Sequence, residues 1–217
     1  MRLEKMDLFF EKRAADYDRH MLEEVDGCKE GYRKLASCLP QNLHTLLDLG
    51  CGTGLELAPI FARFPALKVT GIDLAQGMLL RLREKYPDKN ITLLKKSYLG
   101  CSFGTAVFDA AVSFETMHHM THAEKRSVYT EICRALRPGG QYLEADFVAV
   151  NQAEKDRLYA ENCRLRRAEH ISGGVLCHFD TPCTVENQIG LLLQAGFRSA
   201  KLTWQQGNTA LIIAEKE

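Results

Sequence analysis

The chain has 217 residues, of which 46% are hydrophobic and 26% charged, and its 28 basic residues balance its 28 acidic ones. These values predict an ordinary globular protein with one substantial core, and the zero formal charge argues against general electrostatic binding to nucleic acid or an anionic membrane. No run approaches the roughly 20 apolar residues of a membrane span, and residues 1–18 lack the apolar core of a secretory signal, so we expect a cytoplasmic protein.

From about residue 45, short apolar runs alternate with longer helical patterns, which is typical of a parallel sheet covered by helices. Five strands are predicted at residues 45–49, 68–73, 91–95, 108–114 and 141–148. Three of the helices between them are predicted to end near Phe64, Tyr86 and Leu136. The last of these helices is followed by a strong turn sequence, Arg137-Pro138-Gly139-Gly140.

The pattern changes after residue 150. Residues 151–169 are polar and helical, and residues 171–181 are irregular. A helix then starts at Thr184 and ends near Ala195, with Gly196 well placed just past its end. Two last strands, joined by a short connection that predicts an antiparallel hairpin, are expected at residues 200–204 and 209–214.

These elements predict a single α/β domain with a doubly wound, seven-stranded, mostly parallel sheet that ends in an antiparallel hairpin. Residues 45–150 and 184–217 would form the sheet core. Residues 1–44 would form an N-terminal helical lid, and residues 151–183 would form a cap over the substrate. Ligands of such sheets bind beyond the carboxyl ends of the strands, so the residues after each strand are the candidates for a site.

A glycine-rich turn follows the first predicted strand. Gly50, Gly52 and Gly54 let the backbone approach a ligand closely, and they adopt positive φ where the turn needs it. Asp73 ends the second predicted strand, where a carboxylate can accept hydrogen bonds from both hydroxyls of an adenosine ribose. A dinucleotide-binding turn has the spacing G-x-G-x-x-G, whereas this one is G-x-G-x-G with Asp48 two residues before it. The pairing therefore favours an adenosine-containing ligand other than NAD.

Four segments carry a family resemblance. Residues 46–57 and the sequence Gly71-Ile72-Asp73-Leu74 with Met78 resemble the first two motifs of class I methyltransferases that use S-adenosylmethionine (SAM). Residues 108–120 resemble the fourth-strand motif of the branch that acts on small molecules, and residues 136–140 resemble the turn before the fifth strand. The resemblance covers nearly the whole chain except residues 151–183, and it implies SAM as the cofactor and a small molecule as the acceptor.

The resemblance implies roles for individual residues at the cofactor. Asp48 would hold the amino group of SAM, the glycine turn including Cys51 would line the methionine part, and Asp73 would hold the ribose. The remaining cofactor contacts that it implies are Leu74, Met78, Ser97, Tyr98, Phe114, Tyr17 and Arg19. Ser97 stands where many members of the family have an aspartate for the adenine amino group, so this chain departs from the pattern there.

Candidate catalytic residues are His118, His119 and Tyr17. A neutral imidazole at the end of the fourth strand is suited to take a proton from an oxygen or nitrogen nucleophile. Alternatively, the two histidines serve only packing and capping. The sequence around Tyr17 resembles the lid of the same branch, in which an aromatic residue covers the cofactor, with Arg19 or His20 facing the methionine carboxylate. An amphipathic helix that merely packs is the other interpretation.

Acceptor polarity stays open at this stage. The arginines in the polar helix either cover a solvated face or grip an anionic substrate: Arg157, Arg164, Arg166 and Arg167. Glu115 and Glu144 are alternative contacts for an amine substrate. No metal site is expected, because Cys177, His178 and Cys183 beside His170 fit no familiar zinc spacing.

The sequence thus favours methyl transfer from SAM to a nitrogen or oxygen atom of a small molecule, by a monomer or homodimer. Two alternatives share its motifs: an enzyme that modifies SAM itself, of the carboxy-SAM synthase type, and a SAM-binding regulatory or partner subunit without turnover. An NAD-dependent reductase is disfavoured by the glycine spacing and by the predicted terminal hairpin.

Overall fold

The computed structural model describes residues 3–172 and 174–217. Residues 1–2 of the expected lid and Gly173 of the expected cap lie outside the described residues. Within the described residues, no helix has the length and apolarity needed to cross a membrane.

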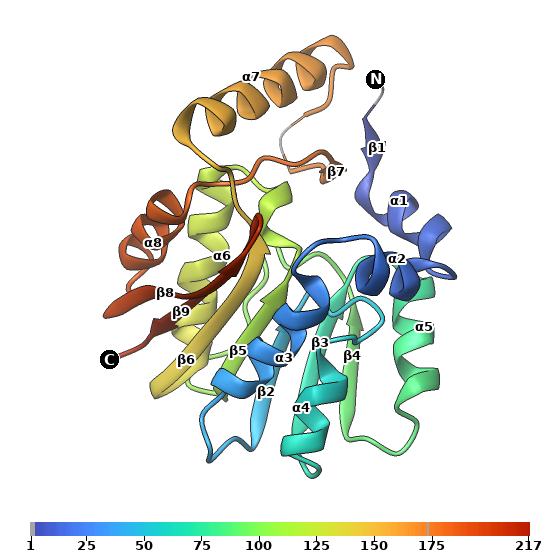
Figure 1. The fold of residues 1–217 in the computed structure, drawn as a ribbon, viewed down its shortest axis with the longest axis vertical. Coiled ribbons are helices and arrows are strands. Elements are labelled where there is room, and N and C mark those ends of the chain that lie inside the picture. The colour runs from blue at the N-terminus through green and yellow to red at the C-terminus, as the bar shows by residue number, and fades with distance from the viewer. Residues whose placement is uncertain (1–2, 173) are drawn as a thin grey trace.

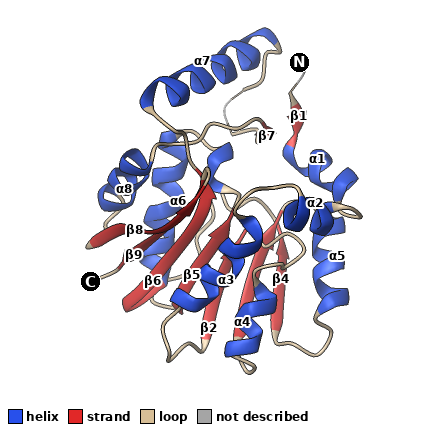
Figure 2. Ribbon diagram, viewed as in Figure 1, coloured by secondary structure: helices blue, strands red, loops and turns tan. Residues whose placement is uncertain are grey.

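A seven-stranded sheet forms the centre of the molecule, in the order β4-β3-β2-β5-β6-β9-β8 (Figures 1 and 2). The first five of these strands run parallel, and β9 lies antiparallel to both β6 and β8. The expected fold class, including the antiparallel terminal hairpin, is therefore confirmed. In chain order the strands are β2 (Thr45–Leu49), β3 (Lys68–Asp73), β4 (Ile91–Lys95), β5 (Phe108–Phe114), β6 (Leu136–Phe147), β8 (Ser199–Gln206) and β9 (Thr209–Glu215).

Helices cover both faces of the sheet. Apolar residues of α3 (Cys28–Cys38), α4 (Leu57–Arg63) and α5 (Gln76–Lys85) share one core cluster with the sheet. The opposite face is covered by α6 (His122–Ala135) and α8 (Val185–Gln194), which belong to a second core cluster. The strands between these layers are buried on both faces, which is why they read as continuous apolar runs in the sequence.

Capping residues fix where the helices on the second face begin and end. Thr121 and Glu124 form a reciprocal capping box at the start of α6. Thr184 accepts the Asn187 N–H at the start of α8, and Gly196 follows that helix with a φ of +103°. The start and the end of α8 were both expected from these residue types.

The fifth predicted strand differs from the observed one. Strand β6 begins at Leu136 rather than at residue 141, and its pairing with β5 jumps from Phe108↔Leu136 to Ala110↔Gln141. The expected turn at residues 137–140 is thus a bulge inside a longer strand, with Gly139 at a φ of +73°. Its glycines mark a local bend of the strand rather than its beginning.

The remaining elements gather above the carboxyl ends of the parallel strands (Figure 1). They are β1 (Glu4–Lys5), α1 (Met6–Arg13), α2 (Tyr17–Glu23), the short helix η1 (Met117–His119), α7 (Gln152–Ala168) and β7 (Cys177–His178). Strands β1 and β7 form a small antiparallel pair that joins the N-terminal segment to residues 151–183. A third core cluster with Leu3, Leu165 and Phe179 joins the same segments, so two regions distant in sequence pack together over one edge of the sheet.

Candidate active site

The glycine turn between β2 and α4 has the backbone that its sequence requires. Gly50, Gly52 and Gly54 have φ angles of +69°, +46° and +74°, in the left-handed region that favours glycine. A Cβ at Gly50 would lie 2.4 Å from Thr116 Oγ1. Any larger residue at position 50 would therefore displace the turn from the end of β5.

Asp73 and the glycine turn lie together, as the sequence predicted. The Asp73 carboxylate accepts the Gly52 N–H at 3.0 Å through Oδ2 and the Ala75 N–H at 2.8 Å through Oδ1. Burial raises the pKa of Asp73 above its usual range, and the two amides oppose this effect. The carboxylate is thus fixed between the turn and the start of α5, at the carboxyl end of β3.

Asp48 has a partner that the sequence reasoning missed. Asp48 and Glu56 are buried side by side, and Asp48 Oδ2 and Glu56 Oε1 have no hydrogen-bond partner among the described residues. Burial, together with Glu56, raises the pKa of Asp48 well above its ordinary value, and burial raises that of Glu56 to about 7. A buried pair of acids with open acceptor atoms is suited to receive an ammonium group.

Replacing Glu56 with glutamine is expected to flatten the pH dependence of stability. The folded-state pKa of Glu56 is raised by burial to about 7, so this residue stabilises the fold below its unfolded pKa of 4.5 and loses that contribution as the pH rises through 7. The variant lacks this ionisation. Its free energy of unfolding should therefore fall less than that of the native chain as the pH rises from about 4.5 to 7. Urea unfolding of both chains across this range measures the difference, and parallel curves would contradict the assignment.

The other expected cofactor contacts on this side of the sheet are mostly buried. Cys51 and Met78 are about 1% exposed, and Leu74 is half-buried. Phe114 is buried at the end of β5 and stacks on Tyr32 of α3, with the ring centroids 3.9 Å apart. Phe114 therefore forms the floor beneath the N-terminal helices.

Ser97 and Tyr98, the two expected cofactor contacts after β4, both make contacts within the protein. Ser97 Oγ accepts the Leu99 N–H at 3.1 Å, so it closes its own loop. Tyr98 is buried in the core cluster on the α6 side, and its hydroxyl lies 2.9 Å from Thr116 Oγ1. Ser97 is half-buried, whereas Tyr98 is buried.

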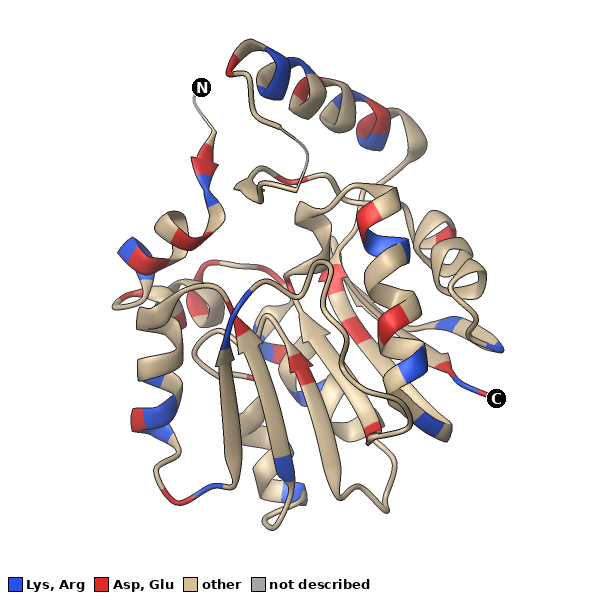
Figure 3. Ribbon diagram, turned by 180° about the vertical axis from the view of Figure 1, so that it is seen from behind, with Lys and Arg blue, Asp and Glu red and all other residues tan. Residues whose placement is uncertain are grey.

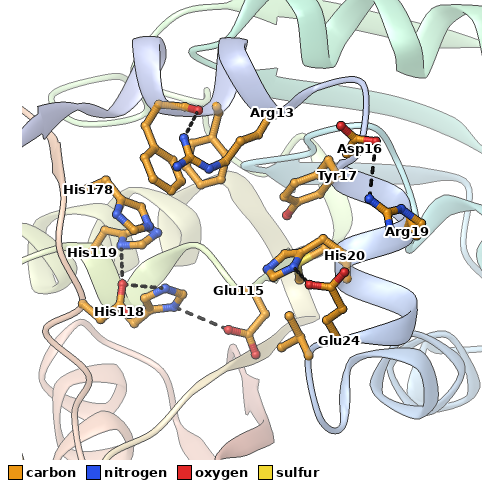
Figure 4. A pocket seen from close by; sticks show the side chains of 15 residues that line it. Arg13, Asp16, Tyr17, Arg19, His20, Glu24, Glu115, His118, His119 and His178 are labelled. Carbon is orange, nitrogen blue, oxygen red and sulfur yellow. Dashed lines mark hydrogen bonds and ion pairs between the residues drawn. The ribbon is translucent and has the colours of Figure 1, made fainter.

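A cavity of about 520 Å³ lies between the N-terminal helices and the carboxyl rim of the sheet (Figure 4). Tyr17, Arg19, His118 and His119, predicted from two separate parts of the sequence, all line it. The residues that complete the wall are Phe9, Phe10, Arg13, Asp16, His20, Met21, Glu24, Val25, Glu115, His178 and Asp180. Glu115 stands out for its φ of +48°, a strained conformation for a residue with a side chain.

Helices α1 and α2 are attached to the cofactor side of the sheet. Cε1 of Tyr17 lies 3.8 Å from the position that a Cβ at Gly52 would take, so its ring covers the glycine turn. Asp18 binds both Thr53 of that turn and Lys85 of α5. Glu11 accepts the Gly77 N–H in the first turn of α5, at 2.9 and 3.1 Å. These contacts attach the N-terminal segment to the glycine turn and to α5.

The two histidines differ in their surroundings. His118 Nδ1 lies 2.7 Å from Asp146 Oδ1, and although burial lowers the pKa of His118, Asp146 and the neighbouring carboxylates raise it to about 9. Burial and the nearby His118 lower the pKa of His119 to about 4. His119 Nδ1 lies 3.3 Å from Asp180 Oδ1. Sequence reasoning found the histidines but missed Asp146 and Asp180, which no local pattern marks.

Several expected contacts lie away from the cavity. Glu144 is buried in a core network with Tyr129 and Gln188, so the idea that it contacts an amine substrate is wrong. The arginines of α7 do not line the cavity either. Arg164 pairs with Glu161, and Arg166 donates to the carbonyls of residues 172 and 175. Figure 3 shows acidic and basic residues interspersed on α7, which agrees with a solvated face.

The cysteines near residue 180 do not converge on His178. Cys183 is buried beside Lys125, whose Nζ lies 3.5 Å from its Sγ, and Cys177 belongs to the small core cluster around α7. His178 instead stacks on Phe9 at 3.5 Å and borders the cavity. Among the described residues, the groups with converging metal-ligand atoms contain His118 rather than a cysteine.

Comparison with known proteins agrees with this geometry. Residues 46–140, which contain the glycine turn, Asp73 and both histidines, match the family model described as "Methyltransferase domain". The chain is therefore similar to the class I SAM-dependent methyltransferases over this segment. SAM is the cofactor of that family, and the matched residues include its expected site.

Individual relatives are similar to this chain over part of their length. The chain is 28% identical over 163 residues to the O-methyltransferase cnsE of Penicillium expansum. The aligned segment covers 73% of this chain and 53% of that protein. The chain is 31% identical over 117 residues to 24-methylenesterol C-methyltransferase 2 of Oryza sativa subsp. japonica, covering 52% of this chain and 31% of the relative. The chain thus spans about half or less of these curated relatives.

Solved structures share the fold of this chain. An O-methyltransferase family protein from Burkholderia thailandensis aligns with a TM-score of 0.68 at 17% identity, covering 94% of this chain and 59% of that one. Human N-acetylserotonin methyltransferase in complex with SAM aligns with a TM-score of 0.61 at 17% identity. The alignment covers 86% of this chain and 51% of the human one.

Proposed function

We propose that this chain transfers the methyl group of SAM to an oxygen atom of a small, partly apolar molecule. The observation that carries the proposal is the cavity of about 520 Å³, which is lined by the two histidines and by Tyr17, whose ring also covers the glycine turn. Small-molecule sites usually have volumes of about 300–1,000 Å³ and mainly apolar walls with a few polar groups. Relatives named as O-methyltransferases favour oxygen over nitrogen as the acceptor atom.

The cofactor would lie along the carboxyl ends of β2 and β3. The glycine turn would line the methionine part of SAM, and Asp48 with Glu56 would receive its amino group at their open acceptor atoms. Asp73 would hold the ribose, because its carboxylate already stands at the end of β3 next to the turn. Leu74, Met78 and Ser97 would surround the adenine, while Tyr17 would cover the cofactor from above.

The acceptor would occupy the cavity itself. Transfer from a sulfonium is an in-line displacement, so the protein mainly has to align the acceptor atom, the methyl carbon and the sulfur. His118, His119 and Tyr17 would orient and ionise the acceptor, while Phe9 and Phe10 supply apolar contact. Residues 1–44 would act as a lid, and residues 151–183 would complete the wall with His178 and Asp180.

A turnover assay with methyl-labelled SAM tests the proposal. Panels of small hydroxylated molecules and of matched amines, phenols against anilines for example, are incubated with the chain, and labelled product and S-adenosylhomocysteine are measured by mass spectrometry. We expect acceptor-dependent formation of both products with hydroxylated molecules. Turnover confined to the amines would contradict the oxygen assignment. Tight SAM binding without turnover in either panel would favour a binding protein instead.

A further inference from the structure

Three side chains at the cavity wall converge on one point. His118 Nε2 lies 3.7 Å and His119 Nδ1 lies 3.3 Å from the same oxygen, Oδ1 of Asp180. The three atoms lie within 4.8 Å of one another. Ligand atoms at usual bond lengths around a tetrahedral zinc ion lie about 3.4 Å apart. Both separations from Asp180 Oδ1 are therefore close to the distance between two ligand atoms of one ion of this size.

The facing atoms have no other partner. His119 Nδ1 and Asp180 Oδ1 are buried, and neither makes a hydrogen bond among the described residues. The His119 side chain is only 5% exposed. Buried polar atoms are normally paired, and an unpaired one indicates strain or a missing water or ion. A cation between these atoms would satisfy both.

A surrounding set of hydrogen bonds fixes the arrangement. Asp146 lies 2.7 Å from His118 Nδ1, so the proton of Nδ1 is directed at Asp146 and Nε2 is the nitrogen that faces Asp180. An ion bound at Nε2 would displace the proton of that nitrogen. A carboxylate behind a metal-binding histidine is the usual arrangement for orienting the ring. The N–H and the hydroxyl of Thr181 both donate to the His118 carbonyl, at 2.7 and 3.0 Å, and so tie the two ligand segments together.

A second possible group of ligands, Glu115 with His118 and Asp146, is less suitable. It would use His118 Nδ1, which is already engaged by Asp146 at hydrogen-bond distance. An ion between these two atoms would have to break that bond and push them apart. The group that includes His119 and Asp180 needs no such change.

We propose that His118, His119 and Asp180 bind one divalent transition metal ion of the zinc and iron(II) class. Two imidazoles and one carboxylate favour these metals over magnesium, which prefers oxygen ligands. Three protein ligands leave a coordination position for a substrate, as in catalytic metal sites. All three ligands line the cavity, so that position would be available to the acceptor.

The chemical role of the ion rests on the proposed function. A hydroxyl oxygen bound to such an ion loses its proton to solvent at a lower pH than in free solution. The resulting oxyanion would form the new bond to the methyl carbon while the carbon–sulfur bond of SAM breaks. The electron pair of that bond stays on sulfur, which gives S-adenosylhomocysteine and the methylated acceptor.

Metal binding is measured without any acceptor. Full-length protein freed of metal with a chelator is titrated with Zn²⁺ by calorimetry and with Co²⁺ by visible absorption. We expect one ion per chain and the intense absorption of Co²⁺ in a site of low coordination number. His119→Ala and Asp180→Asn should abolish both signals, and Asp146→Asn should weaken binding by roughly 10- to 100-fold because it releases the His118 ring.

His20→Ala is the matched control, because His20 lines the same cavity but pairs with Glu24. This variant should bind both metals like the native chain. Absence of binding by the native chain, or binding that persists in His119→Ala and Asp180→Asn, would overturn the proposal. SAM titration of the same samples separates a failure of the metal site from a failure of the proposed function. SAM binding without metal binding counts against the metal site alone, and metal binding without SAM binding counts against the proposed function.

Discussion

Replacing Asp73 with alanine is expected to weaken SAM binding by about 100-fold or more, because each hydrogen bond to a charged group contributes about 1.5–3 kcal/mol and two would be lost. The Asp73 carboxylate is fixed at the end of β3 by the Gly52 and Ala75 amides. The two ribose hydroxyls would donate to the same carboxylate. The fold should survive, since the β3 ladder to β2 and β4 uses only backbone groups.

Calorimetric titration with SAM measures this effect, with circular dichroism as a check on folding. Asp109→Ala is a suitable control, because Asp109 begins β5 at the opposite end of the sheet and binds the His44 and Thr45 amides. That variant should lose stability but keep its SAM affinity. A folded Asp73→Ala protein with native affinity would disprove the ribose assignment.

Replacing His119 with alanine is expected to lower kcat by about 100-fold or more while SAM affinity stays unchanged, because a positioned group that moves or removes the acceptor proton contributes at least about that factor. The His119 side chain lines the cavity, and its Nδ1 lies beside Asp180 rather than at the glycine turn. It should therefore act on the acceptor rather than on the cofactor.

Steady-state kinetics with an acceptor found in the screen, together with SAM titration, separate the two effects. His122→Ala removes an imidazole that lies outside the cavity, near Tyr159 of α7, and should leave kcat within a small factor of the native value. An equal loss in both variants would mean that the effect does not depend on the position of His119 in the cavity. A loss of SAM affinity in His119→Ala would place this residue at the cofactor instead.

Much of the sheet could be predicted from the sequence, since its central strands are buried on both faces. Residues 45–49, 68–73, 91–95 and 108–114 are short apolar runs whose ends coincide with those of the observed strands. The small pair of β1 and β7 could not be predicted. Each of these strands has two residues and no alternating pattern, and they pair across more than 170 positions of sequence.

The site residues likewise include some that local sequence places and others that only long-range packing places. The glycine turn and Asp73 were predictable because one strand–turn–helix unit and the end of the next strand place them. Glu56, Asp146 and Asp180 were not, because only the packing of distant segments brings each of them to its partner. Tyr98, expected as a ligand contact from its position after β4, also packs its ring into the core cluster on the α6 side, which no local pattern marks.

A ligand titration tests the central claim most directly. Thermal shift and calorimetry would compare SAM, S-adenosylhomocysteine, carboxy-SAM and NAD on the purified chain. A ligand at about 100 times its dissociation constant stabilises the folded state by about 2.7 kcal/mol, which moves the melting midpoint visibly. The account predicts that SAM and S-adenosylhomocysteine bind to one site per chain and that NAD has no effect. Preference for carboxy-SAM over SAM, or no response to any of the four, would contradict it.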